Sequence, residues 1–495
     1  MIKMDFLLAI IIVGFCSCVV LWMVHNSSIR RRLPPGPTPL PFLGNILQIK
    51  RRELVTFLKE MRCQYGDIFT VYLGPKPVVV VSGYQFVKEA LLQCDDAFIG
   101  RGETPCLDAS YKNFGFVFTN NLKRWRELRR FSLKILKDLG MGKKGAEEKI
   151  IEEAQHLVKE LRKNTVPMFN PNDFLIRASS NVVCALLFGQ TFDYDEKDMW
   201  SLIHGIHDTF YLMSTFSGQL YSMFPGIMKY LPGNHQKIFK NMDDLMSFID
   251  TRVQKNQKTL DINSPRDYID AFLIKMEKEK ENPNTEFNMI NLVCNALQIF
   301  FAGAETTSTT LKYGFLLLLK HPGVQEKIHK EIDIVIGRDR SPRFEDKSQM
   351  PYTDAVIHEI LRFSDLVPFS MPRAVTKDIK FHGYTIPKNT TSFLLLTSVL
   401  HDPALFPNPE SFNPKNFLDD YGRFKKNDAF LAFAAGKRTC FGESLARMEL
   451  FIFFTTVLQN FKLSSPIHPE DLDITPSVSG IGNFPRPYKL CIGSR

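Results

Sequence analysis

The chain has 495 residues, of which 44% are hydrophobic, so it can bury a large core and is not a disordered protein. Its 62 Lys and Arg against 53 Asp and Glu give a net charge of +9, too dilute and too evenly mixed to indicate a nucleic-acid-binding surface. Nine cysteines without framework spacing argue against a disulfide-stapled secreted domain. We therefore expect a large globular protein with free thiols, one of which has a chemical role.

The N-terminal run from Phe6 to Val24 carries no charge and would measure about 28 Å as a helix, enough to cross a bilayer core. A cleaved signal peptide is the alternative, but large residues stand where a small-residue cleavage site belongs. Arg30, Arg31 and Arg32 follow the run, and this positive charge places the rest of the chain in the cytosol. The sequence thus predicts a single-pass membrane anchor over residues 1–28.

A basic and proline-rich segment over residues 29–45 follows the predicted anchor. Pro34, Pro35, Pro37, Pro39 and Pro41 prevent a helix or a central strand and hold the chain extended. We expect this segment to act as a stiff hinge. No linker is recognisable after residue 50, so residues 46–495 are predicted to form one domain.

Short strand-like runs and long helical patterns share the predicted domain. Two β-rich runs, 69–73 and 78–81, flank a Gly-Pro turn and predict a hairpin, and a second β region covers 379–396. Helical periodicity is clear over 147–162, 238–253 and 445–459. From Asn288 to Lys320 no proline occurs, which predicts one long apolar helix along the axis of the core. A mainly α-helical fold with a smaller β-rich part follows.

Cys440 stands in the strongest motif of the chain. It lies within Phe433-Ala434-Ala435-Gly436-Lys437-Arg438-Thr439-Cys440-Phe441-Gly442, directly before a helical pattern. The flanking glycines are expected to let the backbone approach a flat cofactor, and amide N–H groups at the helix start stabilise a thiolate, the form that binds metals. Cys440 is therefore the predicted metal ligand.

The segment resembles the haem-binding signature of the cytochrome P450 family, at all five defining positions. The resemblance implies the fold of that family and a haem b (iron protoporphyrin IX) with a Cys440 thiolate as axial ligand. It also implies that Phe433, Gly436 and Arg438 lie against the haem.

Further segments match the family in turn. Residues 302–307, Ala-Gly-Ala-Glu-Thr-Thr, resemble the distal helix, which assigns haem contact to Ala302 and proton delivery to Glu305 and Thr306. Glu359 and Arg362 resemble the structural Glu-Arg pair of the family. Asn416 stands where an arginine often supports that pair, so an amide is expected in place of a third charge.

Several basic and aromatic residues match positions that hold the haem propionates or the substrate. The propionate set implied by the resemblance is Arg101, Trp125, Arg129, Arg373 and Arg438. The substrate pocket is expected to be apolar, with Phe369 nearest the iron from the substrate side. Its predicted lining is Phe114, Phe116, Phe118, Ile299, Ala302, Val367, Phe369 and Val478.

The whole chain most resembles the microsomal family 2 enzymes of vertebrates, and two stretches, 140–145 and 352–359, resemble its subfamily K. The implied activity is a monooxygenase that activates O₂ with NADPH electrons and hydroxylates or epoxidises lipophilic substrates such as fatty acids, xenobiotics or steroids. A haem-thiolate peroxide isomerase and a non-catalytic haem or lipid carrier are the alternatives.

The resemblance also names partners and a location. NADPH-cytochrome P450 reductase is the expected electron donor, with cytochrome b5 as an optional second one, and no nucleic acid is expected. Lys123, Arg124, Arg126 and Arg130 are predicted to form a basic docking face for the acidic flavoprotein. The expected location is the endoplasmic-reticulum membrane, with the catalytic domain in the cytosol.

Overall fold

The computed structural model describes residues 13, 14, 17, 30, 32–49, 54–164 and 166–495. The predicted anchor over residues 1–28 therefore lies almost wholly outside the described residues. Among the helices that are described, none combines the length and the apolar character that a membrane span requires.

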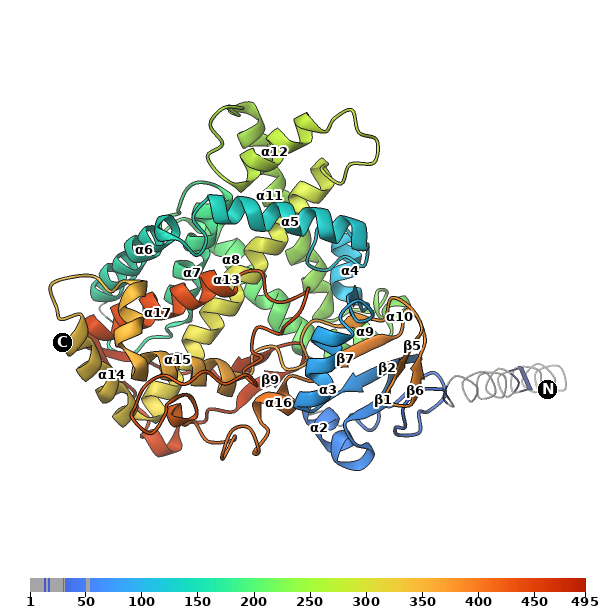
Figure 1. The fold of residues 1–495 in the computed structure, drawn as a ribbon. Helices are drawn as coiled ribbons and strands as arrows, with labels where there is room; N and C mark the ends of the chain where they lie inside the picture. The colour runs from blue at the N-terminus through green and yellow to red at the C-terminus, as the bar shows by residue number, and fades with distance from the viewer. Residues whose placement is uncertain (1–12, 15–16, 18–29, 31, 50–53, 165) are drawn as a thin grey trace, which may run out of the picture.

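Helices make up most of the molecule, which confirms the predicted fold class (Figure 1). The α-helices are α2 (Leu54–Tyr65), α3 (Tyr84–Lys88), α4 (Pro105–Tyr111), α5 (Leu122–Asp138), α6 (Lys144–Lys163), α7 (Asn172–Leu187), α8 (Lys197–Ser214), α9 (Phe216–Met223), α10 (Pro225–Met228), α11 (His235–Lys258), α12 (Tyr268–Lys278), α13 (Met289–Lys320), α14 (Pro322–Val335), α15 (Pro351–Ser364), α16 (Thr397–Leu400) and α17 (Glu443–Asn460). Shorter helical turns are η1 (Glu89–Gln93), η2 (Phe344–Gln349), η3 (Pro414–Phe417) and η4 (Pro469–Asp471).

The strands gather mainly in one part of the molecule, on the right in Figure 1. They are β1 (Ile68–Leu73), β2 (Lys76–Val81), β3 (Gly100–Arg101), β4 (Arg373–Ala374), β5 (Ile379–Phe381), β6 (Tyr384–Ile386), β7 (Thr391–Leu394), β8 (Phe461–Ser464), β9 (Pro476–Ser479), β10 (Asn483–Pro485) and β11 (Cys491–Ser494). The main sheet has the order β1-β2-β7-β4-β3, and three two-stranded sheets, β5-β6, β9-β10 and β8-β11, complete the set.

The main sheet joins segments that are far apart in the sequence. β1 and β2 form the predicted antiparallel hairpin, in which Ile68 pairs with Val81. β2 then pairs in parallel with β7, and β4 pairs with both β7 and β3. Because β3 precedes α5 and β4 follows α15, this sheet brings the two regions to one edge of the helical core.

Helix α13 is the predicted long helix and begins one residue later than expected, with the Asn288 side chain accepting the Asn291 N–H as a cap. Two glycines let neighbouring helices approach it closely. A Cβ on Gly303 would lie 2.7 Å from Val183 of α7, and one on Gly314 would lie 1.9 Å from the ring of Phe454 of α17. The helix therefore runs through the core between α7 and α17.

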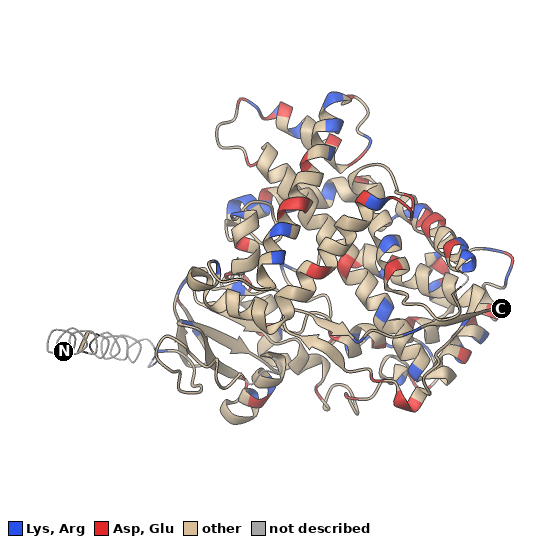
Figure 2. Cartoon of the chain, turned by 180° about the vertical axis from the view of Figure 1, so that it is seen from behind, with Lys and Arg blue, Asp and Glu red and all other residues tan. Residues whose placement is uncertain are grey.

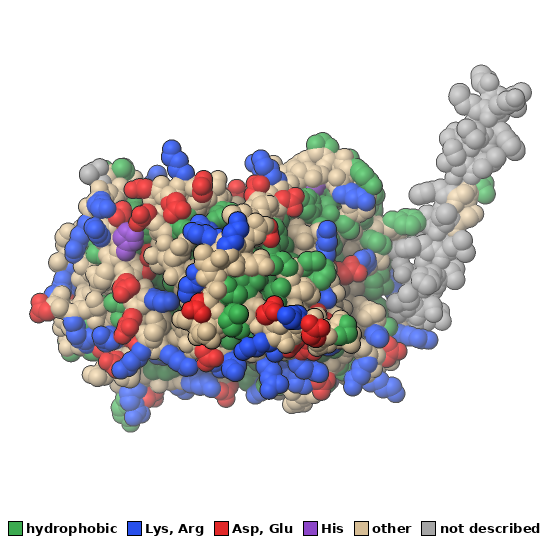
Figure 3. Space-filling view, turned by 90° about the horizontal axis from the view of Figure 1, so that it is seen from above, with side chains coloured by type: hydrophobic (Ala, Val, Ile, Leu, Met, Phe, Trp, Pro, Cys, Tyr) green, Lys and Arg blue, Asp and Glu red, His purple; other side chains and the backbone are tan. Residues whose placement is uncertain are grey.

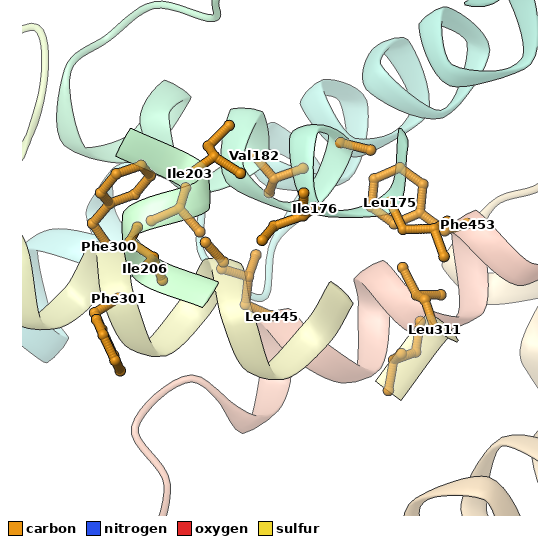
Figure 4. Close-up of a cluster of buried hydrophobic side chains, with 14 of the residues drawn as sticks. Leu175, Ile176, Val182, Ile203, Ile206, Phe300, Phe301, Leu311, Leu445 and Phe453 are labelled. Carbon is orange, nitrogen blue, oxygen red and sulfur yellow. The ribbon is translucent and has the colours of Figure 1, made fainter. Parts of the chain in front are cut away.

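The apolar core surrounds α13 on several sides. In Figure 4, Phe300 and Phe301 of α13 lie near Ile203 and Ile206 of α8, and side chains of α7 and α17 continue the cluster. Charged residues of both signs are interspersed along the helices and loops of the described chain (Figure 2). This distribution agrees with the even mixture that the composition indicates.

The segment predicted to be a stiff hinge, residues 29–45, is attached to the sheet where the structure describes it, from residue 32 onward. Thr70 of β1 donates its N–H to the Pro35 carbonyl, and Asn45 donates its N–H to the Tyr72 carbonyl. Leu33 is buried, and a Cβ on Gly36 would overlap the Thr70 carbonyl. The proline-rich chain is extended as predicted, but it packs as an edge of the folded domain, because its free carbonyls can accept hydrogen bonds even though proline has no N–H.

Candidate functional site

A cavity of about 270 Å³ lies between α13, α5 and the loop before α17. Most of its wall is apolar, and the polar part is concentrated in a few side chains. Thirteen residues singled out from the sequence line it: Arg101, Phe116, Phe118, Trp125, Arg129, Ile299, Ala302, Glu305, Thr306, Val367, Phe433, Arg438 and Cys440. Residues from widely separated parts of the chain thus meet at one site.

The loop that carries Cys440 is held in a tight conformation. The Cys440 N–H donates to the Phe433 carbonyl at 3.0 Å, and Ala434 has a φ of 55°. Gly436 has a φ of 75°, and a Cβ there would lie 2.0 Å from the Leu91 carbonyl of η1. Within the protein, Gly436 therefore permits a close approach to η1.

The Cys440 sulfur lies on the cavity wall at the start of α17. The Cys440 side chain is exposed at the cavity. The surrounding protein desolvates the thiol and raises its pKa, although the backbone N–H groups of Gly442 and Glu443 donate toward the sulfur and act in the opposite direction. The residues present fit a metal-bound thiolate, because coordination to a cation removes the proton of a thiol.

Four arginines gather beside the cavity because two short strands pair there. In the β3–β4 ladder Arg101 is directly opposite Arg373, an unfavourable position for like charges. Arg129 and Arg438 lie near this pair, since their charges, like that of Arg373, act on Arg101. Such a cluster requires negative charge to be stable.

One of these side chains, Arg438, donates its hydrogen bonds to backbone carbonyls. The three guanidinium nitrogens of Arg438 donate to the carbonyls of Ile99, Phe116 and Thr119 at 3.0–3.2 Å. Its guanidinium also lies over the Trp125 ring, 4.5 Å from the centroid. Arg438 therefore ties the loop before α17 to the segment that precedes α5, and its charge remains at the cavity.

Other donors near the cavity have no partner in the described structure. These are the indole Nε1 of Trp125 and the Nε and Nη2 atoms of Arg373, all buried. Burial, together with the neighbouring arginines, lowers the pKa of Arg438 to about 8 and that of Arg373 to about 10, and lowers that of Arg101. Unsatisfied donors and uncompensated cations fit the two carboxylates of a haem, so the residues present match the cofactor that the resemblance implies.

One face of α13 forms the opposite wall of the cavity. Ile299, Ala302 and Thr306 are spaced by three and four residues, which places them on the same side of the helix. The Thr306 hydroxyl donates to the Ala302 carbonyl at 2.7 Å, and Glu305 is fully buried. An alcohol and an acid thus lie at the wall that faces the Cys440 side.

Three of the predicted pocket residues do not line this cavity. Phe114 lies under the Arg124 guanidinium, 4.6 Å from its centre, and Val478 pairs with Phe484 in the β9–β10 ladder. Phe369, expected nearest the iron, is buried on the sheet side, where its ring stacks on Phe393 with centroids 4.6 Å apart. Val367, from the same loop and also among the predicted pocket residues, does line the cavity.

Several residues of the cavity wall were not predicted from the sequence. Phe210 and Met213 reach it from α8, and Val183 and Leu186 from α7. Their amphipathic patterns are those of any core helix, so no local signal separates them from ordinary packing. Another missed residue is His207 of α8, whose ring contacts Glu305.

Glu359 and Arg362 are fully buried on α15, next to Leu361, which lines the cavity. Arg362 also donates from Nη1 to the Leu400 carbonyl at 2.8 Å. The Asn416 side-chain amide donates to both carboxylate oxygens of Glu359 at 3.2 Å. An amide therefore supports the pair, as predicted, where a third charge often stands in the family. The pair thus joins α15 to the segment around η3.

Comparison with known proteins gives a consistent result. A family model described as cytochrome P450 matches residues 34–492. Cytochrome P450 2A5 of Mus musculus is 50% identical over 490 residues, covering 99% of both chains. Cytochromes P450 2B4 and 2G1 of Oryctolagus cuniculus are 48% and 49% identical, each over 487 residues and 98% of this chain, covering 99% and 98% of their own chains.

Proposed function

The chain belongs to the cytochrome P450 family, and from that premise we propose which of its residues perform the reaction. The protein is a haem-thiolate monooxygenase that takes electrons from NADPH through a reductase and acts on lipophilic substrates. When bound, the haem supplies the redox chemistry that activates O₂. Cys440 would hold the haem iron through its sulfur, a role supported by its place on the cavity wall just before α17.

The proposed haem-binding groups are Trp125, Arg101, Arg129, Arg373 and Arg438. The single observation that carries this assignment is the group of buried donors without partners, Trp125 Nε1 and Arg373 Nε and Nη2, among cations that repel one another. Two propionates would satisfy the donors and balance the charge. Arg438 would act mainly by charge, since its nitrogens already donate to backbone carbonyls.

Glu305 and Thr306 are the proposed proton-transfer residues. The Thr306 hydroxyl is on the cavity wall and donates its one proton to the Ala302 carbonyl. To relay a proton it would release that carbonyl, donate its own proton into the cavity and take a replacement that comes from Glu305. Apolar neighbours such as Ile299 and Ala302 exclude bulk water from the same wall. Protons would therefore arrive through specific side chains instead of open solvent.

The substrate is held by shape and apolar area. Phe116, Phe118, Phe210 and Ile481 line the cavity. Besides the groups assigned above to protons and propionates, two further buried acids, Asp365 and Glu449, lie on its wall. Fatty acids, xenobiotics and steroids all satisfy this requirement, with medium-chain fatty acids favoured if the likeness to subfamily K holds. A turnover assay with purified holoenzyme, reductase and a panel of these classes tests the proposal, and reductase-independent conversion of a peroxide would contradict it.

The protein associates with the endoplasmic-reticulum membrane, as microsomal members of the family do. We further propose a single-pass anchor in the first 28 residues and a cytosolic catalytic domain. Exposed apolar side chains support this orientation: Leu43 and Leu47 lie in and after the proline-rich segment, and Ile227, Tyr230 and Leu231 follow α9. The end of α9 approaches the β1–β2 turn, because an added Cβ on Gly74 would lie 2.8 Å from the Met223 carbonyl.

Figure 3 shows hydrophobic side chains gathered toward the end of the molecule that carries the β-rich part. A surface of this kind can rest in the interfacial region of a bilayer. Protease protection in sealed microsomes tests the orientation: digestion of the catalytic domain from outside is expected, and full protection would contradict a cytosolic domain.

A further inference from the structure

Glu305 has an ion-pair partner on a different helix. The Nδ1 atom of His207, on α8, lies 2.8 Å from Oε1 of Glu305. The Thr309 hydroxyl donates to the same oxygen at 2.9 Å, whereas Oε2 is buried and has no partner in the described structure. One carboxylate oxygen is therefore fixed by two protein groups, and the other remains available.

The available oxygen belongs to a residue of the cavity wall. An unpartnered carboxylate oxygen in a buried position is costly unless water or a ligand satisfies it. Because Glu305 lines the cavity, a water or polar ligand in the cavity can donate a hydrogen bond to Oε2. Fixing Oε1 thus decides which oxygen exchanges protons with the cavity.

His207 is the outer member of the pair. Its side chain retains 21% of its exposure, against 0% for Glu305. The rings of Tyr211 and Phe484 lie 6.3 Å and 5.9 Å from it, and Ile206 beside it joins the apolar cluster of Figure 4. The buried acid therefore meets the partly solvated side of α8 through this imidazole.

We propose that His207 is a positioning residue of the monooxygenase reaction: its protonated ring fixes Glu305 through Oε1 and keeps Oε2 for proton transfer at the cavity wall. The inference rests on the proposed role of Glu305 and Thr306. It adds a residue from α8, a helix that carries none of the signature motifs.

The charges around the pair favour this arrangement. Burial lowers the pKa of His207, but the charge and hydrogen bond of Glu305 outweigh burial, so this pKa is raised. Lys312 of α13 acts in the opposite direction, Asp208 adds a smaller increase, and Lys312 itself interacts with Glu305 and with Asp173 of α7. The ion pair should therefore persist to a higher pH than an isolated histidine would allow, and weaken above it.

Two variants separate the charge of His207 from its hydrogen bond. His207→Leu removes both, and His207→Gln keeps an N–H donor that cannot titrate. His204→Gln is the matched control, because His204 lies one turn earlier on α8, is exposed and stacks on Trp200. Each variant is studied as the haem-loaded full chain, by melting temperature against pH and by product and hydrogen peroxide formed per NADPH against pH.

A raised histidine pKa contributes stability that is fully present below about pH 6.5 and is lost as pH rises through the folded-state pKa. We therefore expect the melting temperature of wild type to exceed that of His207→Leu most at low pH, with the difference shrinking as pH rises. We also expect His207→Leu to raise the hydrogen peroxide formed per NADPH severalfold. His207→Gln should raise it less, and its peroxide per NADPH should not change with pH in the range where His207 titrates in wild type. His204→Gln should match wild type.

The inference would be overturned if, in both His207 variants, the melting temperature differed from wild type by the same amount at every pH and product and peroxide per NADPH were unchanged. The contact would then be merely structural. Glu305→Gln identifies which claim has failed. If Glu305→Gln raises peroxide and the His207 variants do not, only the role of His207 is overturned. If Glu305→Gln is also without effect, the proposed proton-transfer function fails together with this inference.

Discussion

Arg362 holds the carboxylate of Glu359 through two hydrogen bonds, from Nε to Oε2 and from Nη2 to Oε1, both 2.8 Å long, in a fully buried position. Removing one partner of such a pair leaves an uncompensated charge in the core. We expect Glu359→Ala to lower the free energy of unfolding by about 3–5 kcal/mol. The measurement is the urea concentration at which the holoenzyme loses its haem spectrum.

The chain offers a matched control for this variant. Glu127 and Arg130 have the same spacing on α5, but Arg130 is exposed and Glu127 only half-buried. Glu127→Ala should change the free energy of unfolding by no more than about 0.5 kcal/mol. Equal losses in the two variants would show that the spacing, and not the burial of the Glu359 pair, determines the effect.

Thr306→Ala is expected to uncouple NADPH oxidation from product formation. Without the hydroxyl, no side chain at this position delivers protons to the cavity, so hydrogen peroxide should form in place of product. Product per NADPH should fall by roughly tenfold or more. Thr306→Ser keeps the hydroxyl and should retain most of the coupling. Unchanged product per NADPH in the alanine variant would remove Thr306 from proton transfer.

The basic surface of α5 is expected to bind the reductase. Lys123 and Arg126 are exposed, whereas the Arg124 Nε lies 2.6 Å from Glu286 Oε2 and is already paired. Reversing the charge at both exposed positions should raise the reductase concentration for half-maximal rate by about tenfold, and added salt should weaken the effect. Lys237→Glu with Lys240→Glu on α11 is the control, and an equal response to both pairs would contradict a docking site on α5.

Glu153 predicts a pH dependence of stability that is independent of catalysis. It is buried on α6, where the Tyr194 hydroxyl donates to Oε1 at 2.8 Å and the Asn181 amide to Oε2 at 3.2 Å, and His156 Nδ1 lies 4.0 Å away. Burial nevertheless raises the pKa of Glu153 to about 8 from the ordinary value of 4.5. The folded state thus binds the proton more tightly than the unfolded state, and stability falls as pH rises from about 4.5 to about 8.

Glu153→Gln removes this titration. We expect its melting temperature to fall less than that of wild type between about pH 6 and about pH 8, the upper part of the titration interval. Glu152→Gln, at the exposed neighbouring position, should follow wild type across this interval. Parallel curves for wild type and Glu153→Gln would show that Glu153 titrates normally.

Local patterns predicted the parts of the molecule whose determinants are close in sequence. The hairpin of β1 and β2 and the long helix α13 each depend on residues within one turn or one helix, and these predictions of secondary structure are confirmed, with the start of α13 displaced by one residue. Trp125 and Arg129 share a face because they are one turn apart on α5. Such relations follow from helix and strand geometry alone.

Tertiary relations between distant segments were not accessible in this way. His207 and Glu305 meet across α8 and α13, and nothing in either segment alone indicates the contact. In the irregular loop after α15, Ser370 has a φ of 59° and Phe369 packs toward Phe393, so no simple alternation tells which side chains reach the cavity. Likewise, the group that leaves no room for a side chain at Gly436 is the Leu91 carbonyl, far away in the sequence.

The central claim is that Cys440 binds the haem iron as a thiolate, and the spectrum of the reduced CO complex tests it directly. Wild type and Cys63→Ser, a variant at an exposed cysteine on α2, should both show the strongly red-shifted Soret band that a thiolate ligand produces. Cys440→Ser should lose that band while the fold persists. A red-shifted band retained in Cys440→Ser would identify another cysteine as the ligand and contradict the account.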